Sequence, residues 1–190
     1  MSTMTIVLIV LVLSLLLAVS YTIIVYNGLV QLKNNIDRDW SNIDVLLKQR
    51  FDELPKLIRV CEGYMQHEKR TLEAVIAARS QITSARTEGD RLQAQNALTD
   101  TLRSLFMVVE RYPELKADKA FRELKGRISE IEEMIADRRE FYNEAVNIYN
   151  IRIAQFPDLL VARPFNFTSR TLWQIDASHR HDVEVRFQQN

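Results

Sequence analysis

Four charged side chains occupy positions where the helical spacing of this chain otherwise places apolar residues. They are Arg50, Glu68, Arg79 and Arg138. An unpaired buried charge costs several kcal/mol, so we expect these groups to pair with one another and with acids such as Glu110 or Glu132. Such a set suits either an internal ion-pair layer that fixes helix register, or a polar pocket that binds an anionic ligand or a partner's carboxylate. We favour the ion-pair layer.

Metal and catalytic motifs are incomplete in this chain. His67-Glu68 begins like the zinc-protease motif, but the position that would hold the second histidine is Thr71. The sequence also offers no glycine-rich phosphate loop, serine nucleophile elbow or cysteine-histidine constellation. We therefore expect no enzyme activity, no metal site and no cofactor.

Two tyrosine-asparagine pairs, Tyr142-Asn143 and Tyr149-Asn150, lie one heptad apart. Positions that repeat by a heptad share one face of a helix. The amides are expected to bridge to another helix of the same chain, and the alternative is a subunit interface to which Trp40 would also belong.

The segment from Thr5 to Tyr26 (TIVLIVLVLSLLLAVSYTIIVY) is apolar, and the first charged residue of the chain is Lys33. About 20 such residues in a helix span roughly 30 Å, the thickness of a bilayer core, which predicts a membrane anchor. The alternatives are a buried helix of a soluble domain and a cleavable signal peptide. Core helices seldom stay uncharged for so long, and a signal peptide would need a basic start and a shorter apolar run.

The orientation of the anchor depends on two basic residues. Lys33 and Arg38 follow the apolar run and no Lys or Arg precedes it. The positive-inside rule then predicts an N-terminus outside the cell and a cytoplasmic C-terminal domain.

The composition of the chain bears on its partners, its cellular compartment and its secondary structure. Lys plus Arg and Asp plus Glu both number 25 among 190 residues, so no basic field favours nucleic acid. The single cysteine, Cys61, has no intramolecular disulfide partner, which suits a reducing compartment. Four glycines and four prolines leave little material for β-turns, so the chain is expected to be mostly helical.

Apolar spacing of three and four residues predicts four helices after the anchor. The first continues from the membrane helix to a boundary near Leu54, where Pro55 follows. The others are expected to include Leu57 to Arg86, Arg91 to Glu110 and Asp118 to Gln155, with Gly89 in a turn at positive φ and Asp90 as a cap.

The fold class follows from these helices. We predict an all-α protein in which an N-terminal transmembrane helix (residues 1–28) precedes an antiparallel four-helix bundle (29–157). Residues 158–190 form a non-helical, aromatic tail that wraps the bundle or, as the alternative, adds a strand to a partner.

Many of these positions also recur in one known family. They include the run from Tyr26 to Arg50, Leu54-Pro55, Gly63-Tyr64, His67-Glu68, Tyr112-Pro113, Tyr142-Asn143, Tyr149-Asn150 and Phe156-Pro157. In this pattern the chain resembles the LemA family over about Tyr26 to Pro157. The resemblance implies a bacterial membrane protein with one N-terminal membrane helix, a four-helix bundle and no established enzyme chemistry. One branch of that family is associated with magnetosome membranes, a role that we do not extend to this chain.

Two functions are then weighed. The first is a non-enzymatic scaffold or assembly protein, anchored once in the bacterial inner membrane, that self-associates and binds an unidentified membrane or cytoplasmic protein but no nucleic acid. The alternative is a membrane-tethered sensory bundle whose inward-facing arginines bind an anionic ligand.

Overall fold

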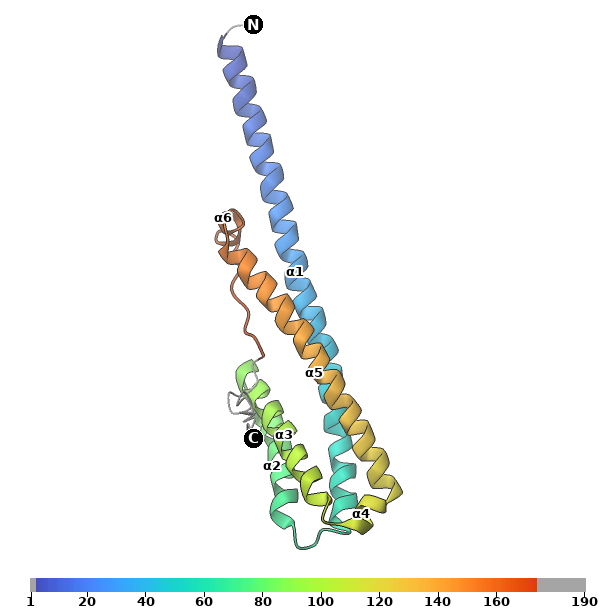
Figure 1. Ribbon diagram of the computed structural model, residues 1–190. Helices are drawn as coiled ribbons and strands as arrows, with labels where there is room; N and C mark the ends of the chain where they lie inside the picture. Colours follow the sequence, from blue (N-terminus) through green and yellow to red (C-terminus); the bar gives the residue numbers. More distant parts are fainter. Residues whose placement is uncertain (1–2, 174–190) are drawn as a thin grey trace, which may run out of the picture. The chain divides into compact units, whose positions relative to one another are not determined.

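The computed structural model describes residues 3–173, and every regular element in that range is a helix (Figure 1). The all-helical class is therefore confirmed. The helices are α1 (Thr3–Glu62), α2 (Lys69–Ser84), α3 (Glu88–Val109), α4 (Pro113–Ala117), α5 (Lys119–Ala154) and α6 (Leu159–Ala162). The tail from residue 158 was expected to be non-helical, and this is wrong for its first part, because α6 lies within it. Residues 174–190, where the tail was considered as a strand added to a partner, lie outside the described residues.

Helix α1 continues without interruption from the apolar segment into the following sequence, as the spacing predicted. The boundary expected near Leu54 is wrong, because Pro55 lies inside the helix. A proline removes one backbone hydrogen bond, but the completely buried Leu54 and Leu57 on either side secure the helix by packing. Leu57 therefore belongs to α1, and the second helix begins only at Lys69.

The start of α3 also differs from the expectation. Thr87, not Asp90, is the cap, and its hydroxyl accepts a hydrogen bond from the Asp90 N–H at 3.1 Å. Gly89 lies in the first turn of the helix, and its φ is not positive. The long fourth helix was predicted within one residue at each end, because α5 spans Lys119–Ala154.

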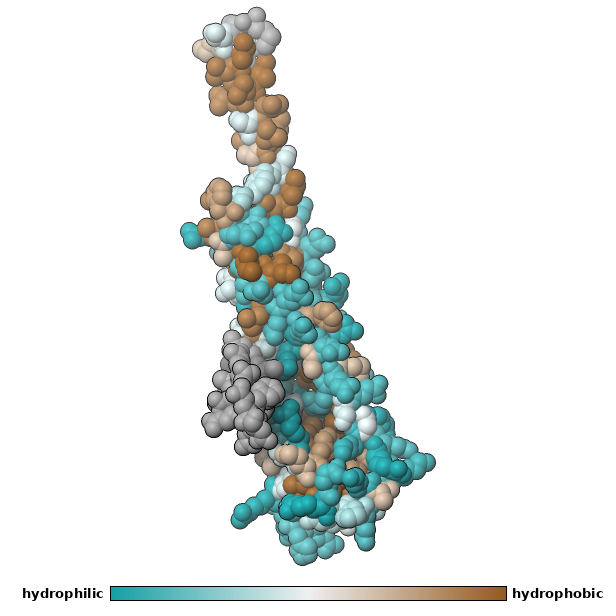
Figure 2. Space-filling model, viewed as in Figure 1, coloured by the Kyte–Doolittle hydropathy of each residue, from teal (hydrophilic) through white to brown (hydrophobic). Residues whose placement is uncertain are grey.

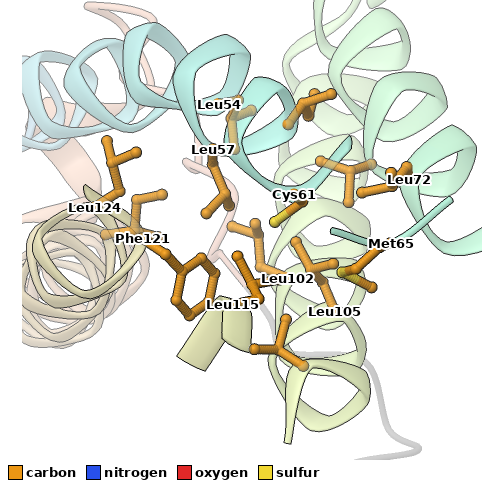
Figure 3. Packing of buried hydrophobic residues seen from close by; sticks show 14 of the residues in the cluster. Leu54, Leu57, Cys61, Met65, Leu72, Leu102, Leu105, Leu115, Phe121 and Leu124 are labelled. Atoms are coloured by element: carbon orange, nitrogen blue, oxygen red, sulfur yellow. The ribbon is translucent and has the colours of Figure 1, made fainter. Parts of the chain in front are cut away.

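The chain divides into two compact units, and α1 and α5 contribute to both. Among the described residues, the first unit comprises 3–44 and 137–172, and the second comprises 45–136 with Trp173. The second unit contains the larger apolar core, in which side chains of five helices meet (Figure 3). Labelled examples are Leu57 of α1, Leu72 of α2, Leu102 of α3, Leu115 of α4 and Phe121 of α5.

The first unit pairs the earlier part of α1 with the later part of α5. Its apolar cluster joins Val25 and Leu29 of α1 to Val161 and Ala162 of α6. By length and composition, α1 is the one helix among residues 3–173 that could cross a membrane. Figure 2 shows hydrophobic side chains covering its N-terminal part, and the side chains from Thr3 to Tyr21 are all exposed.

Candidate functional site

The most buried charge in the described chain is Arg50, of which only 1% is exposed. Its Nη1 donates to the Thr99 hydroxyl at 2.8 Å and to the Glu132 carboxylate, and its Nη2 donates to the Gln95 side-chain oxygen. The Thr99 hydroxyl is also within 3.1 Å of the second Glu132 oxygen. One cation is therefore neutralised by one carboxylate inside a polar cluster.

Local sequence explains why these groups converge. Arg50 lies between the buried Leu47 and Leu54 on α1, so the helix turns it toward the same core. Gln95 and Thr99 are four residues apart on α3 and share a face. Glu132 follows directly after the buried Ile131 on α5. The cluster thus links three helices of the second unit.

Glu68 and Glu110 have partners other than the predicted arginines. Glu68 Oε1 accepts from Arg111 Nη2 at 3.0 Å and from the Tyr112 hydroxyl at 3.3 Å. Glu110 accepts from Lys116 at 2.5 Å, and this hydrogen bond lowers the pKa of the Glu110 carboxyl. Burial, and then the nearby Glu68 charge, raise the pKa of Tyr112.

The remaining two predicted charges do not join the cluster either. The Arg79 guanidinium carbon lies 4.2 Å from the centre of the Phe51 ring, a cation-π contact, and its buried Nε has no hydrogen-bond partner. Arg138 is exposed. The expectation of a single inward-facing layer is therefore corrected: Arg50 forms a buried pair with Glu132, and the other predicted charges have separate surroundings.

Tyr142, Tyr149 and Asn150 bind an extended segment of their own chain, residues 167–172, which we call the strap. The Tyr142 hydroxyl donates to the Thr171 carbonyl at 3.1 Å, and the Tyr149 hydroxyl donates to the Thr168 carbonyl at 3.1 Å. Asn150 both donates to the Arg170 carbonyl and accepts from the Arg170 N–H, each at 2.9 Å. Burial raises the pKa of Tyr149.

The strap also contacts α1, because Arg170 Nη2 donates to Asp37 Oδ1 at 3.2 Å. Trp40 of α1 packs its ring 5.5 Å from that of Tyr142. Asn143 is half-buried beside them. These residues were candidates for a bridge to another helix or for a subunit interface. The expected bridge to a helix is wrong for Asn150, whose amide binds the non-helical strap, and Tyr142 and Tyr149 also bind the strap.

A further group was missed by the sequence analysis. Asp158, which is buried, accepts from Arg152 Nε at 2.7 Å and lies 3.4 Å from the Tyr21 hydroxyl. A Cβ on Gly28 would meet Arg152 Nη1 at 3.3 Å, so the glycine leaves room for the guanidinium. The spacing of six residues between Arg152 and Asp158, across a proline, gave no periodic signal from which to predict the pair.

Within residues 3–173, His, Cys, Asp and Glu side chains form no group of three or more that could hold a metal ion. An open groove of about 490 Å³ lies between the end of α2, the turn that follows it and the first part of α3. It is lined by small and polar side chains that include Ser84, Arg86 and Gln93. This groove does not include Arg50 or the strap.

Comparison with known proteins gives consistent results. Residues 39–187, most of the chain, match the LemA family. The chain is 26% identical over 160 residues to Protein LemA of Metamycoplasma hominis, a match that covers 84% of this chain and 73% of that protein. It is 36% identical over 66 residues to magnetosome proteins MamQ 1 and MamQ 2 of Paramagnetospirillum magneticum, covering 35% of this chain but only 24% of each of those proteins. With the extent of the family match, these findings establish that the chain belongs to the LemA family.

Proposed function

We propose that this protein is a non-enzymatic scaffold or assembly protein, anchored once in the bacterial inner membrane, that acts by self-association and by binding a membrane or cytoplasmic protein. The observation that carries the proposal is the continuity of α1. One helix of 60 residues leads from the apolar segment to the core around Leu54 and Leu57. In this proposal, the continuous helix couples the anchor to the domain.

Self-association is argued from this coupling on physical grounds. An anchor confines the copies to one plane and raises their effective concentration. A stiff connection also reduces the rotational freedom that each copy loses on binding. Weak contacts between the helical domains then suffice to form a homo-oligomer.

The domain that makes these contacts is, in this proposal, an antiparallel four-helix bundle formed by the C-terminal part of α1 with α2, α3 and α5. Support comes from the shared apolar core of these helices. The cytoplasmic orientation rests on Lys33 and Arg38 after the anchor. The balanced charge of the chain favours protein and lipid partners over nucleic acid.

The sensory alternative is less well supported by the surroundings of the arginines. Glu132 and Gln95 already bind the Arg50 guanidinium, so an anionic ligand would have to displace a carboxylate from a buried pair. Arg79 lies against Phe51. The same buried pairing supports a structural role over a catalytic one.

Chemical cross-linking of the full-length protein tests self-association. In nanodiscs that hold several copies of the protein, we expect cross-linked dimers or larger species. These species should persist when the concentration of nanodiscs is lowered while the number of copies per nanodisc is kept the same. Monomers under all these conditions would contradict the scaffold proposal. A rise in melting temperature with one compound of an anionic metabolite panel would favour the sensory alternative.

A fused reporter enzyme tests on which side of the membrane the C-terminal domain lies. Alkaline phosphatase fused after Asn190 should be inactive if the C-terminal domain is cytoplasmic. Full activity of this fusion would place the domain on the opposite side, without affecting the arguments for the anchor or for self-association.

A further inference from the structure

The chain folds back on its first helix through the segment 155–165, which contains α6 and which we call the elbow. Val161 and Ala162 of the elbow are buried against Val25 and Leu29 of α1. The Tyr26 ring packs edge-on against Phe165, with centroids 4.9 Å apart. The elbow is therefore packed directly on the part of α1 where the apolar run ends.

The outer surface of the elbow is unusually apolar for a loop. Its large side chains Phe156, Leu160 and Phe165 are 77%, 64% and 53% exposed. Figure 2 shows brown surface at the place where Figure 1 labels α6. Single exposed apolar residues need no explanation, but three on ten consecutive residues form a patch that water solvates poorly.

The one carboxylate of the elbow faces inward, while its other polar side chains, Gln155 and Arg163, are exposed. Asp158 is buried and forms an ion pair with Arg152, which reaches across Gly28 of α1. A charge near hydrocarbon is costly unless it is paired, and this pair neutralises Asp158 inside the protein. The elbow thus buries its carboxylate, and its exposed surface combines aromatic and aliphatic groups with Gln155 and the basic Arg163, whose charge suits lipid headgroups.

The position of the elbow along α1 indicates that lipid covers the exposed apolar side chains of the elbow. The hydroxyl of Tyr21, a residue inside the apolar run, lies 3.4 Å from Asp158. Tyrosines such as Tyr21 and Tyr26 are enriched at the boundary between hydrocarbon and headgroups. An element packed at this level meets the interface of the same leaflet from which α1 emerges.

We propose that the elbow is a second membrane contact, in which Phe156, Leu160 and Phe165 insert into the headgroup and upper acyl region of the bilayer beside α1. This inference rests on the membrane anchoring in the proposed function. The occupant is lipid because the patch adjoins the exposed, apolar surface of α1 itself. Two attachment points fix the tilt and rotation of α1, which a single helix does not determine.

Depth-dependent fluorescence quenching in liposomes tests the elbow in the full-length protein. Single cysteines replace Phe156, Leu160, Phe141 or Ser14, and each carries an environment-sensitive fluorophore. Phe141 is the matched control, because it is the same residue type, is 56% exposed and lies one residue from Tyr142, which packs on Trp40 of α1. Trp40 follows Tyr26 by 14 residues, roughly 21 Å of helix beyond the apolar run. The native Cys61 is buried and should react little with the fluorophore. The parent protein, treated with the same fluorophore, therefore measures the background emission from Cys61.

We expect phosphatidylcholine that is spin-labelled near the headgroup to quench most of the emission from Phe156→Cys and Leu160→Cys and little from Phe141→Cys. Ser14→Cys, inside the apolar run, should be quenched best by spin labels deep in the acyl chain. Quenching of Ser14→Cys without quenching at the elbow would overturn the second contact while the anchor stands. Failure to quench Ser14→Cys would instead refute the anchor.

Iodide, an aqueous quencher, distinguishes a patch that is covered by lipid from one that is covered by protein. Elbow labels that are shielded both from spin-labelled lipid and from iodide would be covered by another protein copy, which also contradicts the proposal. Labels that iodide reaches freely would show that the patch faces water. Labels are placed at two elbow positions so that misfolding of one variant does not decide the result. A correctly folded elbow should give the same depth of quenching at Phe156→Cys and at Leu160→Cys.

Discussion

Asn150 and Arg170 exchange two hydrogen bonds, with the Asn150 amide nitrogen donating to the Arg170 carbonyl and the Arg170 N–H donating to the Asn150 amide oxygen, each at 2.9 Å. One side-chain amide thus satisfies both backbone groups of an extended residue, as a neighbouring strand would. The hydroxyls of Tyr142 and Tyr149 bind two more carbonyls of the strap. Helix α5 therefore provides an extended segment with partners that it cannot supply to itself.

The first prediction concerns release of the strap. Asn150→Leu should make the chain cleavable by trypsin after Arg170, because loss of both hydrogen bonds weakens the strap locally by about 1–3 kcal/mol. Mass spectrometry would detect a fragment that begins at Thr171. Asn147→Leu, at an exposed asparagine on the same helix, is the matched control. Equal cleavage of the two variants would mean that Asn150 does not hold the strap.

The second prediction concerns the buried pair of Arg50 and Glu132. Glu132→Leu should lower the free energy of unfolding by roughly 3–5 kcal/mol, because it leaves the Arg50 cation buried without its counter-ion. Arg50→Met should cost less, since the Glu132 side chain is partly exposed and can reach water. Denaturant unfolding of the full-length protein in detergent measures both effects.

The double variant separates pairing from packing. Arg50→Met combined with Glu132→Leu should recover much of the loss, because apolar groups of similar volume often replace a buried pair at little cost. Glu133→Leu, at the exposed neighbouring position, controls for a change of helix surface. Additive losses in the double variant would indicate that the two residues act independently.

Periodicity predicted the elements that pack by regular apolar spacing. The apolar run identified the start of α1, and the seam of α5 gave its ends within one residue. At Pro55 the local rule for proline failed, although the spacing from Leu47 through Leu54 to Leu57 and Cys61 continued unbroken across it. The energy of packing outweighed the lost hydrogen bond.

Charged positions and irregular segments were harder to predict. Spacing of three or four after Ile135 fits either Arg138 or Arg139, and the structure exposes Arg138 while half-burying Arg139. The heptad of Tyr142 and Tyr149 correctly placed both residues on one face. Its partner, the strap, has no period, because its backbone is satisfied by side chains from elsewhere in the chain.

The third prediction concerns the reactivity of Cys61. Burial, and then the nearby Glu62 carboxylate, raise the pKa of this thiol to about 12. At about pH 8 almost no thiolate is present, and only the thiolate is a good nucleophile. Iodoacetamide should therefore modify the native protein slowly and the urea-unfolded protein rapidly, as measured by intact mass. Rapid modification of the native state would contradict the packing of Cys61 in the core.

The last prediction concerns acid sensitivity at the start of α5. Asp118 Oδ1 accepts the Phe121 N–H at 2.9 Å, and Oδ2 accepts the Tyr64 hydroxyl at 3.0 Å. These hydrogen bonds, that from Phe121 first, lower the pKa of Asp118 below the ordinary value of 3.8. The unfolded chain then binds more protons than the native state in this range, so the stabilisation is complete above about pH 4 and disappears as pH falls through the lowered pKa.

Asp118→Asn isolates this contribution, because its amide oxygen still accepts the Phe121 N–H and its NH2 group can donate to the Tyr64 oxygen, but the amide does not titrate. The melting temperature of the parent should exceed that of the variant near neutral pH, and the difference should shrink as pH falls below about 4. Glu133→Gln, which removes an exposed carboxylate from the same helix, controls for the change in net charge. A difference between parent and Asp118→Asn that stays constant from about pH 7 to about pH 3 would show that ionisation of Asp118 does not stabilise the fold.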